Sequence, residues 1–98
     1  MLEVTVDIEK ALSHEAVIYF TAPWCGPCAN LKPQVARAGT IDNNNTYYII
    51  NVDEIDKKYL DEFAISSVPH IYIIKDREII REIQSRKAEQ IIEEVNNV

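Results

Sequence analysis

Two cysteines, Cys25 and Cys28, stand three positions apart where a nearly continuous apolar run, residues 16–22, gives way to a helical pattern. They are the only cysteines in the chain, and a bond between them closes a loop too short to fasten distant segments. The pair therefore indicates chemistry rather than scaffolding. The fold must place it at a junction between a strand and a helix.

The spacing of apolar residues predicts an alternation of strands and helices along the whole chain. Strands are expected at residues 2–6, 16–22, 46–52, 70–75 and 78–83. Helices are expected after Asp7, from the cysteine motif to Gly39, between Asp53 and Phe63, and over residues 88–95. Residues 76 and 77 form a two-residue turn, which predicts that the last two strands pair as an antiparallel hairpin.

This order, βαβαβαββα, predicts an α/β fold with a mixed central sheet and helices on both faces. The 98 residues, of which 47% are hydrophobic, fit one domain that spans residues 1–98. Asp7 and Asp53 are expected to cap helices, and Gly39 to end one. Pro33 is expected to kink the helix that it interrupts.

Cys25 is expected to open the helix that follows the apolar run. Unpaired N–H groups at a helix start and the helix dipole favour a thiolate, so the pKa of Cys25 should fall below the free value of about 8.5. Cys28 lies one turn further on and should be more buried. These positions suit Cys25 as the attacking nucleophile and Cys28 as the residue that resolves a mixed disulfide.

The residues around the pair, Trp-Cys-Gly-Pro-Cys at positions 24–28, resemble the active-site signature of thioredoxins. The likeness extends over nearly the whole chain and includes Pro33 and the Val68-Pro69 pair. It implies a thioredoxin fold and a thiol–disulfide oxidoreductase that needs no cofactor. It further implies that Pro69 is cis and that the substrate binds to five residues: Trp24, Gly26, Pro27, Val68 and Pro69.

The chain departs from the family pattern at three places. Tyr19 stands where a buried aspartate is usual, and Ile49 replaces the lysine that often accompanies it. His70, directly after Pro69, is expected either to lie near Cys25 and favour its thiolate or to be a half-exposed strand residue. Ser85 or Arg86 replaces a glycine, which narrows the substrate groove or adds a positive charge beside it.

Alternative functions remain open at this point. A zinc site built on the two thiolates and His70 lacks the four ligands that structural zinc normally takes. A thioredoxin-fold binding subunit of a larger assembly would not need the intact cysteine pair. A glutaredoxin-like reductase coupled to glutathione is the alternative within the enzyme class. The Gly-Pro pair between the cysteines resembles reducing thioredoxins and favours a protein-disulfide reductase.

Charge and composition restrict the partners. The net charge of −6 argues against nucleic acid, which requires clustered basic residues. The chain begins without a basic, apolar leader, and its apolar runs are too short to span a bilayer. We therefore expect a cytoplasmic monomer that acts on protein disulfides and is recycled by a thioredoxin reductase or another thiol reductant. His14 is expected on the surface.

Overall fold

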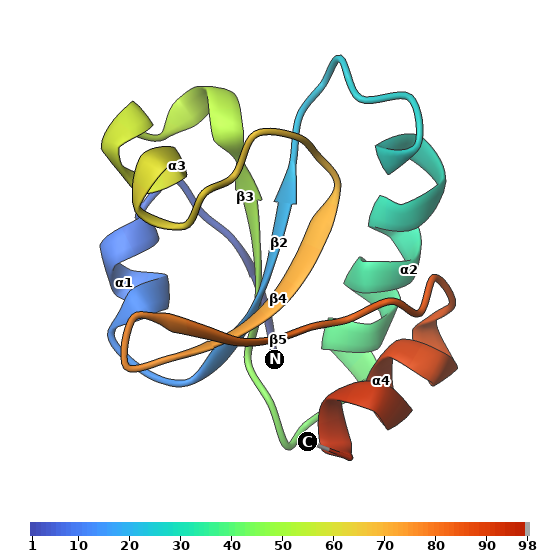
Figure 1. The fold of residues 1–98 in the computed structure, drawn as a ribbon. Coiled ribbons are helices and arrows are strands. Elements are labelled where there is room, and N and C mark those ends of the chain that lie inside the picture. The colour runs from blue at the N-terminus through green and yellow to red at the C-terminus, as the bar shows by residue number, and fades with distance from the viewer. Residues whose placement is uncertain (98) are drawn as a thin grey trace.

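A computed structural model describes residues 1–97; Val98, the last residue of the expected domain, lies outside the described residues. The strands are β1 (Leu2–Val4), β2 (Ala16–Thr21), β3 (Tyr47–Asn51), β4 (His70–Lys75) and β5 (Glu78–Glu82). The helices are α1 (Ile8–Leu12), α2 (Cys28–Ile41), α3 (Lys57–Glu62) and α4 (Ala88–Asn96), with a short 3-10 turn, η1 (Val52–Glu54), after β3 (Figure 1).

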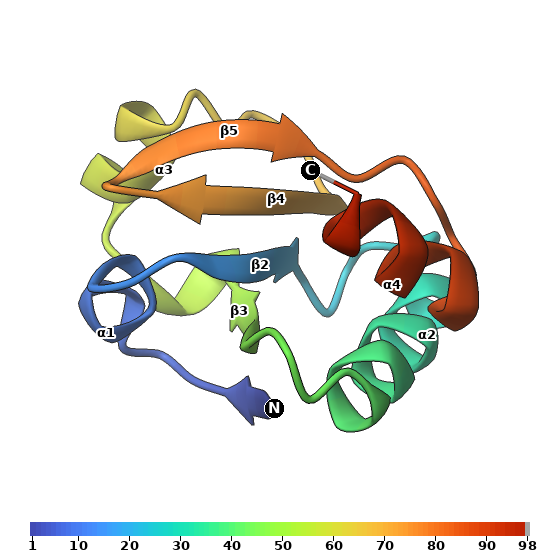
Figure 2. The same cartoon turned by 90° about the horizontal axis from the view of Figure 1, so that it is seen from below.

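The strands form one mixed sheet in the order β1-β3-β2-β4-β5. β3 pairs in parallel with β1 and β2, whereas β4 pairs antiparallel with both β2 and β5. Helices α1 and α3 cover one face and α2 and α4 cover the other (Figures 1 and 2). This arrangement confirms the fold class and the element order that the sequence predicts.

Strand β2 is buried along its whole length, as its continuous apolar pattern predicts. Alternate side chains enter opposite layers of the core. Ile18 and Phe20 pack with residues of α1, whereas Val17 and Tyr19 pack with residues of α2. Burial on both faces holds the end of β2 in place, which is where the chain turns into the cysteine motif.

Helix α2 does not end at Gly39, as the sequence suggested, but continues to Ile41. A Cβ atom built on Gly39 would lie 3.0 Å from both Leu2 Cδ1 and Tyr47 Cβ. Glycine therefore permits the close approach of α2 to the sheet here without displacing its neighbours, and it does not act as a helix stop. Pro33 does lie inside α2, as predicted.

The predicted caps are partly right. The Asp7 carboxylate accepts from Lys10 N at the start of α1, which confirms the first cap. Asp53 caps nothing. Asn51 caps the 3-10 turn, and Asp56 caps α3 by accepting from Lys58 N, because that turn intervenes between β3 and the helix.

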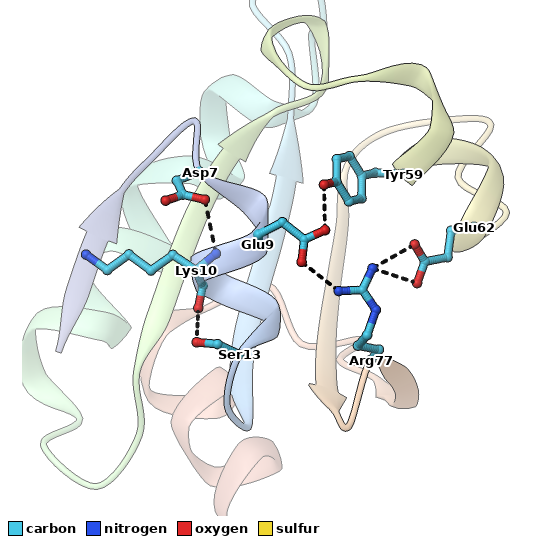
Figure 3. Close-up of polar contacts among 7 residues, drawn as sticks. All are labelled: Asp7, Glu9, Lys10, Ser13, Tyr59, Glu62 and Arg77. Atoms are coloured by element: carbon cyan, nitrogen blue, oxygen red, sulfur yellow. Dashed lines mark hydrogen bonds and ion pairs between the residues drawn. The ribbon is translucent and has the colours of Figure 1, made fainter.

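The hairpin between β4 and β5 is confirmed. Its two turn residues, Asp76 and Arg77, have φ values of 53° and 64°, as a two-residue hairpin turn of the primed type requires. Arg77 then bonds to Glu9 at 2.7 Å and to Glu62 at 3.1 Å, while Tyr59 donates its hydroxyl to Glu9 (Figure 3). This network joins the turn to α1 and α3. Its side chains are largely exposed, so water and salt screen the ion pairs and each stabilises the fold only weakly.

Asp42 is a buried carboxylate at the end of α2 that collects hydrogen bonds from several segments. It accepts from the Tyr47 hydroxyl at 2.8 Å, from the Asn44 backbone N–H and the Asn45 side chain at 3.0 Å each, and from the Asn96 side chain at 3.3 Å. Burial alone would raise the pKa of Asp42, but these donors outweigh it and hold the pKa below its usual range.

Replacing Asp42 tests this cluster. The ionised carboxylate stabilises the fold at all pH values above the unfolded pKa of about 3.9, and this stabilisation is lost as the pH falls through the lower pKa of the folded state. We expect Asp42→Asn to reduce the free energy of unfolding by about 1–3 kcal/mol at pH 7, because an amide nitrogen then faces donors. Urea titrations from pH 2 to 7 measure both effects.

The exposed Asp61 provides the control, since Asp61→Asn should change stability by less than about 0.5 kcal/mol. If Asp42→Asn kept the acid dependence of the parent chain below pH 4, the hydrogen bonds to Asp42 would not carry it.

Candidate active site

Cys25 and Cys28 are joined by a disulfide, with their Cα atoms 5.3 Å apart. The sequence predicted that Cys25 opens the helix, but α2 begins at Cys28, and Pro27 occupies the position just before it. Cys25 therefore lies in the turn that precedes the helix. The difference arises because the tight loop between the cysteines needs its own turn before regular helical bonds begin.

The backbone of α2 nevertheless acts on the Cys25 sulfur. The N–H of Cys28, the first residue of the helix, donates to Cys25 Sγ at 3.2 Å. The next two N–H groups, of Ala29 and Asn30, go to the carbonyls of Gly26 and Pro27. The predicted electrostatic contact between helix start and sulfur is therefore present, with one donor directed at the sulfur across the turn.

Both cysteines are largely buried, and Cys25 is the more accessible. The relative exposure is 8% for Cys25 and 3% for Cys28. The order agrees with the prediction, although Cys25 is less exposed than a helix tip would be. Both pack into the core layer that contains Phe20 and Ala22, with Val68 against it. Gly26, between them, has open space where a side chain would stand, so the loop between the cysteines is unobstructed on that side.

The peptide bond between Val68 and Pro69 is cis, as the resemblance implied. Pro69 directly precedes β4, and β4 pairs antiparallel with β2 so that His70 lies opposite Phe20. This register carries the Val68-Pro69 segment alongside the residues that leave β2 toward the cysteines. The structure therefore brings two segments more than 40 residues apart in sequence to the same end of the sheet.

Trp24 projects from the motif with 66% of its surface exposed. Its indole Nε1 donates to the Asp53 carboxylate at 2.9 Å. Trp24 and Asp53 lie on a small hollow of about 150 Å³, whose wall also includes Val52, Leu60, Ile65 and Val68. This role of Asp53 was not predicted, because nothing in the local sequence pattern links Asp53 to a residue 29 positions earlier.

His70 does not direct its ring nitrogens to the sulfurs. Nδ1 bonds to Glu82 at 2.7 Å and Nε2 to the Ser67 hydroxyl at 3.1 Å, while the ring stacks on Tyr72. The half-exposed strand position that was the second expectation is the one observed. His14 lies on the surface, as predicted.

Tyr19 and Ile49, the two departures in the sheet, are neighbours in the register of β2 and β3. Tyr19 is fully buried, and its hydroxyl has no partner at hydrogen-bond geometry among residues 1–97. Burial raises the pKa of the Tyr19 phenol, and Thr21 and the charge of Arg86 partly oppose this rise. An unpaired phenol costs less to bury than an unpaired charge. The aspartate and the lysine of the family pattern are therefore both absent, since either one alone would leave an unpaired charge in the core.

Two negative findings concern the described part of the chain. Within it, no group of three or more His, Cys, Asp or Glu side chains is placed to hold a metal ion. Nor does any of its helices have the length and apolar character needed to cross a membrane.

Comparison with known proteins agrees with this geometry. The family model "Thioredoxin" matches residues 4–97. An H-type thioredoxin of Ricinus communis is 32% identical over 76% of this chain and 63% of its own length. A chloroplastic thioredoxin F of Oryza sativa subsp. japonica is 25% identical over 93% of this chain and 49% of its own length. The chain thus spans less than two thirds of either relative.

Among solved structures, the oxidised thioredoxin of Plasmodium falciparum superposes with a TM-score of 0.78, at 16% identity, over 99% of this chain and 97% of that protein. The Schistosoma mansoni thioredoxin gives the same TM-score at 20% identity, over 98% and 94%. At such identities these structures show that the fold is the thioredoxin fold. Because the family model matches almost the whole length of this chain, the chain belongs to the thioredoxin family.

Proposed function

We propose that this protein is a thiol–disulfide oxidoreductase that reduces protein disulfides through Cys25 and Cys28. The observation that carries the proposal is the cysteine pair at the start of α2, with a helix N–H on Cys25 Sγ. Such a donor stabilises a thiolate on Cys25 once the pair is reduced. The cis Val68-Pro69 segment, at the same end of the sheet, forms a second side of the proposed substrate site beside the cysteine motif.

The proposed reaction starts from the dithiol. The Cys25 thiolate attacks one sulfur of the substrate disulfide, the substrate S–S bond breaks, and the leaving thiolate takes up a proton. Cys28 then loses its proton and attacks Cys25 Sγ in the mixed disulfide, which releases the second substrate thiolate for protonation. Two electrons and two protons pass to the substrate, and the Cys25–Cys28 disulfide of this structure is the product state.

The remaining site residues are proposed to bind the substrate. Trp24, Gly26 and Pro27 surround the sulfurs within the motif, and Val68 and Pro69 flank them from the segment before β4. The open space at Gly26 and the hollow beside Trp24 support this assignment. Tyr19 enters the proposal as a modulator of the redox couple and not as a reacting group. The contacts of His70 with Glu82 and Ser67 give it no such role.

We further propose that residues 1–98 work as a single domain, as a monomer and in a reducing compartment such as the cytoplasm. A thioredoxin reductase, or another thiol reductant, would return the disulfide to the dithiol. Membership of the thioredoxin family supports a protein disulfide as the substrate and a thiol reductant as the partner that recycles the protein. A glutaredoxin-like reaction with glutathione and a purely structural role are the competing functions. The serine replacements test the structural role, and a reduction potential of about −200 to −230 mV would favour the glutaredoxin-like reaction.

Serine replacements test the two cysteine roles. We expect Cys25→Ser to abolish reduction of a protein disulfide, because the attacking sulfur is absent. Cys28→Ser should instead attack once and remain attached to the substrate, because the resolving sulfur is absent. Mass spectrometry of intact protein detects the adduct, and Cys25→Ser is its matched control. Adduct formation by Cys25→Ser, or a double-serine variant that keeps its biological role, would contradict the proposed function.

The direction of the reaction is tested by the reduction potential of the Cys25–Cys28 couple. A reductase of this type is expected to have a reduction potential of about −270 mV, below that of the glutathione pool as measured by extraction. Equilibration against defined ratios of reduced and oxidised dithiothreitol measures the value. A potential near that of the strong oxidant DsbA, about −120 mV, would reverse the proposed direction while leaving the exchange chemistry intact.

Asp53 is proposed to hold Trp24 in place beside the sulfurs. Trp24 is the only tryptophan in the chain, so fluorescence reports on it alone. In Asp53→Ala the indole loses its acceptor and gains motion, so we expect lower fluorescence anisotropy and a KM for protein substrates about two- to tenfold higher. The neighbouring exposed acid in Glu54→Ala is the control, and equal changes in both variants would count against the role of Asp53.

A further inference from the structure

Within residues 1–97, Arg86 differs from the other arginines in having no acidic partner. Arg37, Arg77 and Arg81 each form an ion pair with a glutamate. Arg86 is exposed and has no carboxylate within 4.0 Å among residues 1–97. Several lysines also have no acidic partner among residues 1–97, so the place of Arg86 in the fold distinguishes it.

Arg86 lies beside the cysteine motif. It shares a surface cavity of about 220 Å³ with Pro27, Asn30 and Leu31. Pro27 stands between the two cysteines, so the cavity adjoins the loop that the proposed substrate must approach. The segment that carries Arg86 joins β5 to α4 and runs along α2 in both ribbon views (Figures 1 and 2).

The backbone on both sides of Arg86 is anchored. Ser85 donates its N–H and its hydroxyl to Glu94 at 3.0 and 2.9 Å. The Ala88 N–H donates to the side chain of Gln34, on α2, at 3.0 Å. The Glu94 carboxylate accepts hydrogen bonds from Ser85 and from Gln84 N, and it forms an ion pair with Arg81. It therefore does not pair with Arg86. The backbone thus holds Arg86 at the cavity. The charge of its guanidinium also acts on the Tyr19 phenol, but the guanidinium has no carboxylate partner among residues 1–97.

A free guanidinium at this place suits one chemical group. Its planar array of N–H donors matches a carboxylate, and it binds that group more specifically than an ammonium does. The net charge of −6 repels acidic partners from the protein as a whole, whereas the positive charge of Arg86 attracts an acidic group to the surface beside the cysteine motif. We propose that Arg86 determines specificity by favouring protein disulfides that have an aspartate or glutamate close to the attacked cysteine. This inference rests on the proposed reductase function and names its substrate class.

Charge reversal at two adjacent positions tests it. Arg86→Glu and Lys87→Glu change the net charge equally, but Lys87 is exposed and does not line the cavity. The probes are disulfide dimers of a short blocked peptide with a central cysteine flanked by glutamate or by glutamine. The measured quantity is the ratio of kcat/KM for the glutamate peptide to that for the glutamine peptide, at low ionic strength.

We expect Arg86→Glu to lower this ratio about two- to fivefold more than Lys87→Glu does, as an exposed ion pair allows. The difference should shrink in 0.5 M salt, because screening weakens it. Circular dichroism establishes that both variants are folded. Equal ratios in the two variants, with normal turnover of the glutamine peptide, would overturn the role of Arg86 alone. Failure of the parent protein to reduce either peptide would instead remove the reductase function and this inference with it.

Discussion

Strand β2 is the element on which the site depends, because it is hydrogen-bonded along both edges and covered on both faces. Its parallel pairing with β3 and antiparallel pairing with β4 leave it little freedom to shift, since a slip by one residue would turn every side chain to the opposite layer. The end of β2 therefore delivers Cys25 to a defined place. The antiparallel partner β4 starts at the same end and brings Pro69 there.

The chemistry of the pair is a balance between burial and backbone polarity. Cys25 is only 8% exposed, and removal from water disfavours a charged sulfur. The Cys28 N–H at 3.2 Å and the positive end of a 14-residue helix favour it. The space at Gly26 is open, so no side chain covers the loop between the cysteines on that side. Trp24, held by Asp53, lines a hollow on one side of the motif, and Arg86 lines a separate cavity with Pro27.

Most of the fold was predictable, because the apolar pattern of each segment is strong and agrees with its neighbours. The burial of β2, the hairpin at Asp76 and the order of the elements followed from residue types alone. Gly39 was misread because a glycine near a helix end looks like a stop, whereas its reason lies in Leu2 and Tyr47. Asp53 was misread as a cap because local rules cannot anticipate the tryptophan that it meets.

The sequence by itself determined that Cys25 and Cys28 form a pair at the junction of a strand and a helix, which their disulfide confirms. The sequence also predicted the mixed sheet and the helices on its two faces, because the spacing of apolar residues within each segment indicates a strand or a helix. Only the tertiary structure decided which groups surround the sulfurs: Asp53 on the indole of Trp24, Glu82 rather than a thiol on His70, and Arg86 against Pro27. Those contacts join residues far apart in the chain, and their geometry exists only once the strands have paired.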